Sequence, residues 1–387
     1  MAKSTFALLL TLLASVAAYS QSRLDRRLVT VPVEINSILA TFLVDTGTER
    51  TVVDSAFAGQ LGLKLSETVL LQGDYSTNEG NAVTANQVRI GRNLWSDVPL
   101  VTQDLSALSR ILAAQISGVL GTDLLASVIV RISYATGTAQ VVAAVPADAL
   151  LMHLKKVRNV YFVPVRIGPS TLEMLLDTGT NMTALSSHAW HSLPSSWKPT
   201  SLLEGLQSSG GPPGSLIACV PALQLGGIEV KQTLLRDYPL RVIMPSHAGI
   251  FADPAFAGIL GGDILDRFEV TLDLQHDSMY LKPERTFQPD AYEFVTIGIQ
   301  FFKSNADAFS VVAVWNHSPG EEAGVVIGDR IVAVNGHSAV DLDLQAFVDQ
   351  LHGPVGTPIV MEIERPTGKI VLNLKTRQLV CQPGAPR

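Results

Sequence analysis

The chain has 387 residues, of which 47% are hydrophobic and 16% are charged, and its formal net charge at pH 7 is −7. This length allows two or three domains, each with a hydrophobic core of its own. The few basic residues are scattered, which argues against nucleic-acid binding, because that function needs clustered Lys and Arg.

The N-terminal residues 1–20 have the pattern of a secretory signal peptide. Lys3 supplies a positive charge, residues 6–18 are mostly apolar, and small residues precede a cleavage position after Ser20. The apolar run is short for a membrane span, which needs about twenty residues. We therefore expect a secreted or periplasmic protein of the bacterial cell envelope. The alternative is an uncleaved segment that anchors the chain in a membrane.

The middle of the chain is an internal repeat. Asp45-Thr46-Gly47 recurs as Asp177-Thr178-Gly179, at an offset of 132 (177 − 45). Each triplet follows an apolar run, which predicts that a buried strand delivers a carboxylate into a tight turn. Downstream, Gly118-Val119-Leu120-Gly121 recurs as Gly258-Ile259-Leu260-Gly261. Two such carboxylates from similar halves can meet at a pseudo-twofold axis, share a proton and activate a water molecule.

At these motifs each half resembles a retropepsin-like aspartic protease lobe, and two lobes in one chain resemble the pepsin-like arrangement. Each copy also closes with a predicted strand pair, in residues 128–142 and 268–282. The resemblance implies a mainly β fold. It implies two acid-protease β-barrel lobes, related by a pseudo-twofold axis, at residues 28–145 and 159–285.

The resemblance further implies aspartic endopeptidase activity, with Asp45 and Asp177 as the catalytic dyad. Two carboxyl groups held close together do not both ionise readily, so they retain one shared proton. The ionised carboxylate would take a proton from water, and the protonated carboxyl would hydrogen-bond the scissile carbonyl. Neighbouring residues would tie the two loops together, admit a close backbone approach and donate to the carboxylates. These supporting residues are Thr46, Gly47, Thr48, Thr178, Gly179 and Thr180.

Substrate would be covered by a mobile hairpin, and each half offers one candidate. The first is the segment 72–80, in which Tyr75 would hydrogen-bond near the site as flap tyrosines do in pepsin-like enzymes. The alternative for Tyr75 is an exposed loop tyrosine. The second candidate is the segment 207–214, which contains Pro212 and Pro213 and is expected to be stiffer. We therefore expect the first hairpin to be the working lid.

After Pro283 the pattern changes. Residues 318–336 contain the string Ser-Pro-x-x-x-Ala-Gly, then Gly-Asp-x-Ile, then Asn-Gly. Apolar residues at i, i+3, i+4 and i+7 predict a helix over residues 344–351, capped by Asp341 or Asp343. A last hairpin is predicted over residues 359–374. This segment, residues 290–380, resembles a PDZ domain of the bacterial protease-associated kind.

The resemblance to a PDZ domain implies that an extended peptide adds to a strand that begins near Ile299, beside the helix at Leu344. The backbone amides of Gly298, Ile299, Gln300 and Phe301 would receive the terminal carboxylate of that peptide. Gln300 departs from the usual Gly-Leu-Gly-Phe loop, where a glycine stands at its position. The alternative is that the domain only packs on the protease lobes.

The remaining reactive residues predict structural roles. Asp123 and Asp263 follow the repeated Leu-Gly motif, and we interpret them as helix caps or turn anchors. Cys219 and Cys381 lie far apart in the sequence, in different predicted domains, and we expect free thiols, with a disulfide as the alternative. No motif for a metal, a phosphate or a serine nucleophile is present, so the sequence predicts neither a metal nor a cofactor.

The sequence therefore predicts a monomeric aspartic endopeptidase with a polypeptide substrate, and a PDZ domain that binds a protein or peptide ligand. A non-catalytic peptide-binding scaffold is the alternative from another class. The intact Asp-Thr-Gly triplet in both halves argues against it, because a scaffold has no need of two buried carboxylates. An enzyme that is active only as a dimer is a second alternative.

Overall fold

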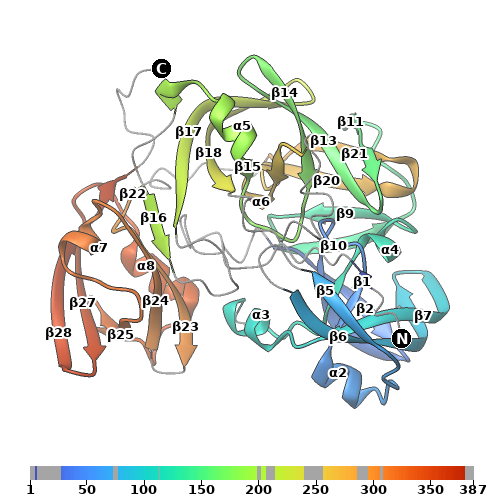
Figure 1. Ribbon diagram of the computed structural model, residues 1–387, viewed down its shortest axis with the longest axis horizontal. Coiled ribbons are helices and arrows are strands. Elements are labelled where there is room, and N and C mark those ends of the chain that lie inside the picture. Colours follow the sequence, from blue (N-terminus) through green and yellow to red (C-terminus); the bar gives the residue numbers. More distant parts are fainter. Residues whose placement is uncertain are drawn as a thin grey trace.

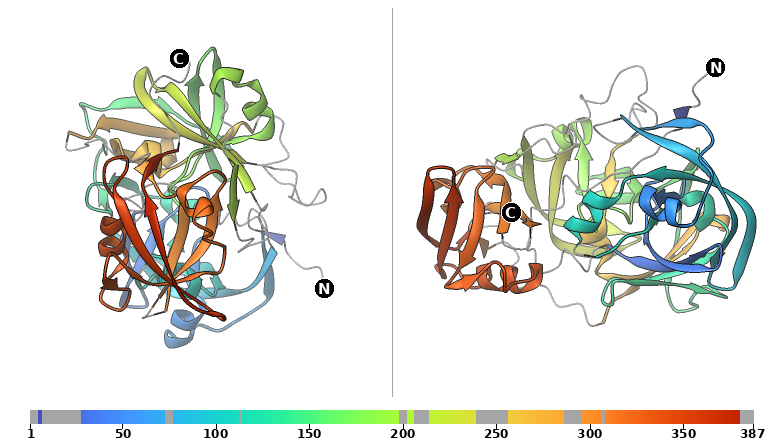
Figure 2. Two further views of the ribbon diagram at one scale, coloured as in Figure 1. Left: turned by 90° about the vertical axis from the view of Figure 1, so that its left-hand side faces the viewer. Right: turned by 90° about the horizontal axis from the view of Figure 1, so that it is seen from below.

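The computed structural model describes residues 5–6, 28–72, 77–112, 114–197, 202–205, 214–238, 256–285, 295–305 and 308–379. As the sequence predicts, the fold is mainly β, with two barrel lobes and a C-terminal PDZ domain (Figure 1). The right-hand view of Figure 2 shows the PDZ domain at one end of the molecule and both lobes at the other.

Lobe 1 begins with a hairpin of β2 (Thr30–Ile35) and β3 (Ile38–Val44). The last three residues of β3 are fully buried, because β3 runs between two hydrophobic clusters: Phe42 and Val44 pack in one, and Leu43 packs in the other. Apolar side chains on both faces explain why the sequence here is continuously apolar. β3 therefore delivers the next residue, Asp45, from a rigid position.

The rest of lobe 1 surrounds this hairpin. β3 pairs in parallel with β8, which pairs with β4, and β4 pairs with β7. Asp54 caps α2, because its carboxylate accepts the backbone amides of Ala56 and Phe57. The other elements of this lobe are β4 (Val52–Asp54), α2 (Ser55–Gln60), β5 (Thr68–Gln72), β6 (Thr77–Ile90), β7 (Asn93–Gln103), α3 (Ser106–Ile111), β8 (Gly118–Leu120) and α4 (Thr122–Leu125), with β1 (Thr5–Phe6) beside β5.

Lobe 2 repeats this plan. β14 pairs in parallel with β19, as β3 does with β8, and β14 ends in three fully buried residues before Asp177. His188 and His191 are exposed on α5, as expected for a solvated helix face. Its elements are β12 (Lys155–Val157), β13 (Val160–Ile167), β14 (Ser170–Leu176), β15 (Ala184–Ser186), α5 (Ser187–Ser192), η2 (Ser195–Trp197), β16 (Leu202–Gly205), β17 (Gly214–Leu225), β18 (Ile228–Tyr238), β19 (Gly258–Leu260) and α6 (Gly262–Leu265).

The two predicted closing strand pairs are present, and they join the lobes. β9 (Ile129–Ser133) pairs with β10 (Thr138–Val142), and β20 (Phe268–Asp273) pairs with β21 (Ser278–Pro283) through the short η5 (Leu274–His276). β9 also pairs antiparallel with β20, from Ser133 opposite Glu269 to Ile129 opposite Asp273. The lobes therefore share one sheet, which β11 (Leu150–His153) extends at its far edge.

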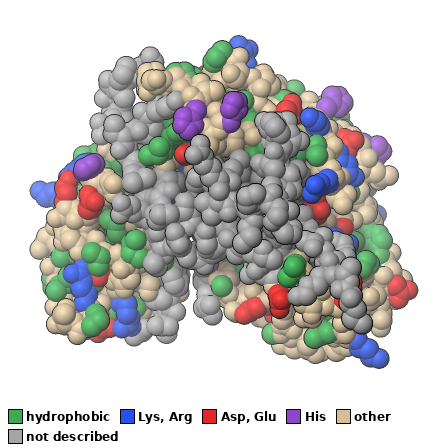
Figure 3. Space-filling model, in the orientation of Figure 1, with side chains coloured by type: hydrophobic (Ala, Val, Ile, Leu, Met, Phe, Trp, Pro, Cys, Tyr) green, Lys and Arg blue, Asp and Glu red, His purple; other side chains and the backbone are tan. Residues whose placement is uncertain are grey.

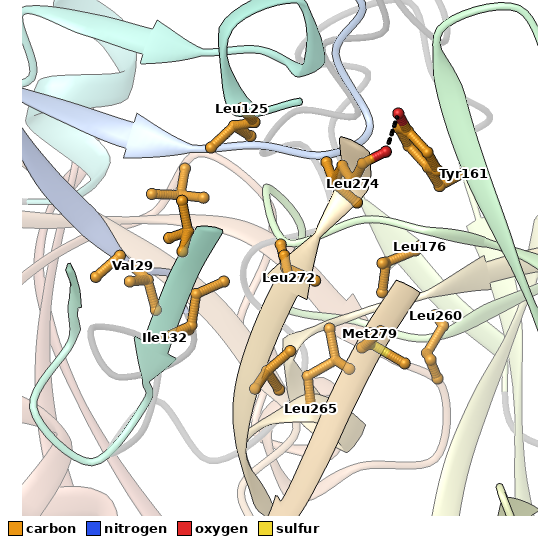
Figure 4. Packing of buried hydrophobic residues seen from close by; sticks show 14 of the residues in the cluster. Val29, Leu125, Ile132, Tyr161, Leu176, Leu260, Leu265, Leu272, Leu274 and Met279 are labelled. Atoms are coloured by element: carbon orange, nitrogen blue, oxygen red, sulfur yellow. Dashed lines mark hydrogen bonds between the residues drawn. The ribbon is translucent and has the colours of Figure 1, made fainter. Parts of the chain in front are cut away.

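One hydrophobic core runs through this junction. Val29 and Ile132 of lobe 1 belong to the same buried cluster as Leu272 and Met279 of lobe 2 (Figure 4). The hydroxyl of Tyr161 donates to the backbone carbonyl of Leu274, over 3.0 Å. This continuous apolar packing fixes the relative position of the two lobes.

The PDZ domain has a separate core. Asp343 caps α8, since its carboxylate accepts the backbone amide of Ala346, which settles the choice between Asp341 and Asp343. Its elements are β22 (Val295–Thr296), β23 (Ile299–Asn305), β24 (Ala308–Trp315), α7 (Pro319–Glu322), β25 (Arg330–Val334), β26 (His337–Ser338), α8 (Leu344–Leu351), β27 (Pro358–Arg365), β28 (Gly368–Lys375) and β29 (Arg377–Gln378).

The expectation of free thiols is wrong. Cys219, on β17, is disulfide-bonded. The other cysteine of the chain, Cys381, lies outside the described residues. The long separation along the sequence was misleading, because β16 of lobe 2 pairs with β24 and brings the PDZ domain beside this lobe.

On the face shown in Figure 3, acidic and basic side chains are interspersed and do not gather into a basic patch. Within the described part of the chain, no helix has the length and apolar character that a membrane span requires.

Candidate active site

Asp45 and Asp177 occupy equivalent positions at the ends of β3 and β14. The backbone amide of Asp45 donates to the carbonyl of Leu120, the last residue of β8. The amide of Asp177 donates in the same way to Leu260, the last residue of β19, and both distances are 3.1 Å. Each side chain accepts the amide of the glycine two residues later, over 2.8 Å in both lobes. Asp45 is 1% exposed and Asp177 is fully buried. The two carboxyl groups therefore have closely matched local environments.

The threonines of the two triplets bind each other across the pseudo-twofold axis. The Thr46 hydroxyl donates to the Leu176 carbonyl over 2.7 Å, and the Thr178 hydroxyl donates to the Val44 carbonyl over 2.9 Å. Each hydroxyl oxygen also accepts the backbone amide of the opposite threonine, over 3.1 Å. These four hydrogen bonds lock the two loops at one separation.

Each of the two glycines lies against the carboxyl group of the opposite loop. A Cβ atom added to Gly47 would lie 2.6 Å from Cγ of Asp177, and one added to Gly179 would lie 2.3 Å from Cγ of Asp45. Each carboxyl group therefore lies directly against the backbone of the opposite loop, which is the loop that carries the other aspartate. No side chain fits at these glycine positions without moving a catalytic candidate.

Thr48 and Thr180, which directly follow the two triplets, connect each loop to the first residue of α4 or α6. The Thr48 carbonyl accepts the amide of Thr122 over 2.9 Å, and the Thr180 carbonyl accepts the amide of Gly262 over 2.8 Å. The Thr180 hydroxyl also accepts the amide of Met182, over 3.4 Å. Donation from these two hydroxyl groups to the carboxylates stays a prediction.

Asp123 and Asp263 serve as anchors, in a pair of interactions that sequence reasoning did not identify. The Thr51 hydroxyl donates to Asp123 and the Thr183 hydroxyl donates to Asp263, both over 2.6 Å. Each hydroxyl oxygen also accepts the amide of the glycine that follows β8 or β19, Gly121 in lobe 1 and Gly261 in lobe 2, over 3.1 Å. The two threonines have the same offset as the two Asp-Thr-Gly triplets (183 − 51 = 132), so the repeat was the signal that could have revealed them.

Charge distinguishes the otherwise similar surroundings of the two loops. In lobe 1, Arg50 lies 3.7 Å from Asp123, and burial raises the pKa of Asp123 although the Thr51 hydrogen bonds oppose the shift. Burial likewise raises the pKa of Glu49, against the opposing effects of Arg158, the Asn159 amide and Arg50. In lobe 2 the residue equivalent to Glu49 is the neutral Asn181 (181 − 49 = 132).

Both predicted hairpins are present, and their tips lie outside the described residues. In lobe 1, β5 pairs with β6 up to Gln72 opposite Thr77, so Tyr75 belongs to the undescribed turn. In lobe 2, β16 pairs with β17 up to Glu204 opposite Gly214. The role predicted for Tyr75 stays a prediction.

The predicted peptide-binding residues of the PDZ domain lie in two environments. Ile299, Phe301 and Leu344 are buried in its core. Gly298 has a φ of +75°, and a Cβ atom there would lie 2.2 Å from Cβ of Ser318, so the turn requires glycine. Gln300 alternates with its two core neighbours and faces the opposite side of the sheet, where it is 3% exposed.

Comparisons with known families match both parts of the chain. Residues 31–124 match the family model of aspartyl proteases, and residues 310–365 match a PDZ-domain model. The chain thus contains an aspartyl-protease-like domain and a PDZ domain. Its fold is also similar to the crystal structure of aspartic proteinase from Irpex lacteus, with a TM-score of 0.42 and 14% identity, over 70% of this chain and 97% of that chain.

Similarity to individual proteins is confined to short stretches. The chain is 37% identical over 73 residues to the carboxy-terminal-processing protease of Bartonella bacilliformis, covering 19% of this chain and 17% of that protein. It is 32% identical over 68 residues to the carboxy-terminal processing protease CtpB of Bacillus subtilis, covering 18% and 14%. It is 34% identical over 91 residues to a probable CtpA-like serine protease of Staphylococcus epidermidis, covering 23% and 18%. The chain therefore spans less than a fifth of the length of these relatives.

Proposed function

We propose that this chain, which joins an aspartyl-protease-like domain to a PDZ domain, is an aspartic endopeptidase that uses Asp45 and Asp177 as its catalytic dyad. The observation that carries the proposal is the reciprocal seating of each carboxyl group on the glycine of the opposite loop. This arrangement gives two matched carboxyl groups a common side, where a water molecule can contact both.

The proposed chemistry follows from this geometry. Two carboxyl groups at such close approach retain one proton between them, because a second negative charge would be strongly disfavoured. The ionised group takes a proton from the water as the water attacks the peptide carbonyl. The protonated group donates to the carbonyl oxygen and stabilises the developing gem-diol. The proton then passes to the leaving amine, so no covalent intermediate with the chain is needed.

The hydrogen bonds within each loop contribute by keeping the carboxyl groups in place. The glycine amide that donates to each aspartate fixes the orientation of that carboxyl group. The Thr46 and Thr178 contacts keep the distance between the two loops constant through the reaction. Such preorganisation avoids the cost of reorienting the groups at the transition state. The hairpin that contains Tyr75 is proposed to close over an extended polypeptide.

The test is cleavage of casein or a peptide library by the full chain between acidic and neutral pH, with Asp45→Asn and Asp177→Asn measured separately. Each variant should lower kcat by about 10²–10⁴-fold, because the proton transfer needs both groups. Asp97→Asn is the matched control, since Asp97 is exposed and its φ of +54° is also accessible to Asn. Activity retained in either dyad variant would exclude the dyad mechanism.

Inhibitors separate this proposal from its rivals. Pepstatin should abolish cleavage, and a serine-directed reagent should leave it unchanged, although one matched relative is named as a serine protease. A pure peptide-binding scaffold would show no cleavage in any arm. A loss of activity above about pH 8 is expected, because the shared proton is then removed.

We also propose that the protein is secreted or periplasmic. The disulfide at Cys219 supports this location, because disulfides persist in oxidising compartments. The signal-like residues 1–20 support it as well. Cell fractionation together with N-terminal sequencing of the mature protein tests both parts of this proposal.

A further inference from the structure

The PDZ domain is joined to lobe 2 by a strand of the second hairpin. One edge of β16 pairs with β17, with Leu203 opposite Ser215. Its other edge pairs antiparallel with β24 of the PDZ domain, with Leu203 opposite Trp315 and Gly205 opposite Ala313. Figure 1 shows β16 between lobe 2 and the PDZ domain. The backbone ladder thus runs without a break from β17 through β16 and β24 to β23.

β24 contains a β-bulge beside the residues that pair with β16. Phe301 pairs with Val311 and Gln300 pairs with Ala313, so Val312 is an extra residue in β24. The extra residue shifts the alternation: Val314 enters the PDZ core, whereas Ala313 and Trp315 turn to the opposite face. Ala313 and Trp315 are each 2% exposed although they are outside that core.

Burial of these side chains shows that the outer face of the PDZ sheet is covered where β16 joins it. Gln300 lies on the same face, opposite Ala313, and is also buried. The junction therefore consists of backbone pairing beside buried side chains of β24, which is more than a flexible tether provides.

In the part of the first hairpin that the structure describes, no strand pairs with the PDZ domain. Within the described residues, the outer strand β5 pairs with β6 and with the two residues of β1. The second hairpin also carries the disulfide-bonded Cys219, on β17. Among the described residues, the second hairpin therefore pairs with the PDZ domain and the first does not.

We propose that the PDZ domain acts as a clamp on the second hairpin, the candidate substrate cover of lobe 2, and limits its motion through the pairing of β16 with β24. This inference rests on the proposed endopeptidase function. Strand pairing at β16 limits the conformations of the hairpin before substrate arrives, so less entropy is lost on binding. Loosening the junction should therefore raise KM and leave kcat nearly unchanged, because the dyad itself is untouched.

The experiment uses the full chain with Trp315→Ala, and Trp315→Phe as the matched control that keeps an aromatic ring. Hydrogen exchange of residues 202–205 reports the junction, and exchange of β27 and β28 reports the integrity of the PDZ fold. Cleavage of a short peptide gives kcat and KM. We expect faster exchange in β16, protected β27 and β28, and a rise in KM of about fivefold or more.

A second variant covers the case in which Trp315→Ala unfolds the PDZ domain or leaves β16 protected. Glu204→Pro removes a backbone amide from β16, and Glu204→Ala is its control because it keeps that amide. The expected changes in exchange and KM are the same as above. If β16 exchanges faster in either variant and KM stays at the wild-type value, the clamp is excluded.

Failure of the clamp and failure of the proposed function give different results. If β16 exchanges as fast in the wild-type chain as in both variants, the junction does not exist in solution and the clamp is excluded whatever the activity. If the wild-type chain cleaves no substrate, the catalytic effect of the clamp is excluded together with the endopeptidase function. Slow exchange of β16 would then show only that the junction forms.

Discussion

The two lobes differ little at the Asp-Thr-Gly loops and increasingly with distance from them. At the loops, the hydrogen bonds of Thr46 have counterparts in those of Thr178, and the two hydroxyl groups donate over similar lengths, 2.7 and 2.9 Å. Two residues after the triplet, lobe 1 carries Glu49, whereas lobe 2 carries the neutral Asn181 at the equivalent position. At the periphery, only the second hairpin pairs with the PDZ domain, among the described residues. Symmetry is therefore close at the two Asp-Thr-Gly loops, and it is lost toward the periphery, where the second hairpin meets the PDZ domain.

The largest effect should come from adding a methyl group at either loop glycine. Gly47→Ala and Gly179→Ala each place a Cβ within 2.6 Å of the opposite aspartate, so the carboxyl group must move. A displacement of this size should lower kcat/KM by about 100-fold or more in both variants. Gly59→Ala is the control, because it has no heavy atom within 4 Å. A loss confined to one lobe would contradict the equivalence of the two loops.

The next effect concerns the threonine contacts between the loops. Thr46→Val and Thr178→Val each remove a donor to a buried carbonyl and an acceptor for a buried amide. Each should lower the free energy of unfolding by about 2–4 kcal/mol, because the groups left behind are buried without partners. Denaturant unfolding measures this cost. Unequal costs, differing by more than about 1 kcal/mol, would show that one lobe dominates the junction.

A smaller effect concerns the pH dependence of stability that Asp123 gives to lobe 1. Burial raises the pKa of Asp123 above its unfolded value, so the folded state binds more protons than the unfolded state between the two pKa values. The stability contribution of this group therefore falls as pH rises through that window, which begins near the unfolded value of about 3.9. In Asp123→Asn this fall should be absent. Thermal unfolding from pH 3 to pH 7 tests it, and an unchanged pH profile would contradict the assignment.

The smallest effect should come from Glu49→Gln, which makes lobe 1 neutral where lobe 2 has Asn181. Burial also raises the pKa of Glu49, so the wild-type chain loses stability as pH rises above the unfolded value of about 4.3, and the variant does not. We expect kcat at acidic pH to change less than twofold, since this side chain does not hold the dyad. A larger change in kcat would assign Glu49 a direct role in positioning the site.

Much of the site followed from the sequence because it is local and repeated. The constant offset between the two halves paired Asp45 with Asp177, and the apolar runs before them gave the buried strands. The same offset relates Thr51 to Thr183, so the repeat also contained the signal for these two anchors, although their hydrogen bonds to Asp123 and Asp263 needed the structure. The capping role of Asp343 was one of two open choices, which a single hydrogen bond settled.

What the sequence did not reveal depends on contacts between distant edges. Residues 202–205 have no pattern that predicts a PDZ strand as their partner, because backbone pairing is nearly independent of side-chain identity. The disulfide at Cys219 was misjudged for the same reason: separation along the chain says little about distance in space. The pairing of β9 with β20 was likewise beyond local reasoning, although both strands were predicted individually.

The pairing of β9 with β20 has a consequence for how the enzyme would behave when it is scarce. Five residue pairs between β9 and β20 join the two halves of a single polypeptide, so the association of the halves is intramolecular. A two-chain enzyme loses its site as its subunits separate at nanomolar concentration. This chain should instead show the same specific activity per molecule at any dilution.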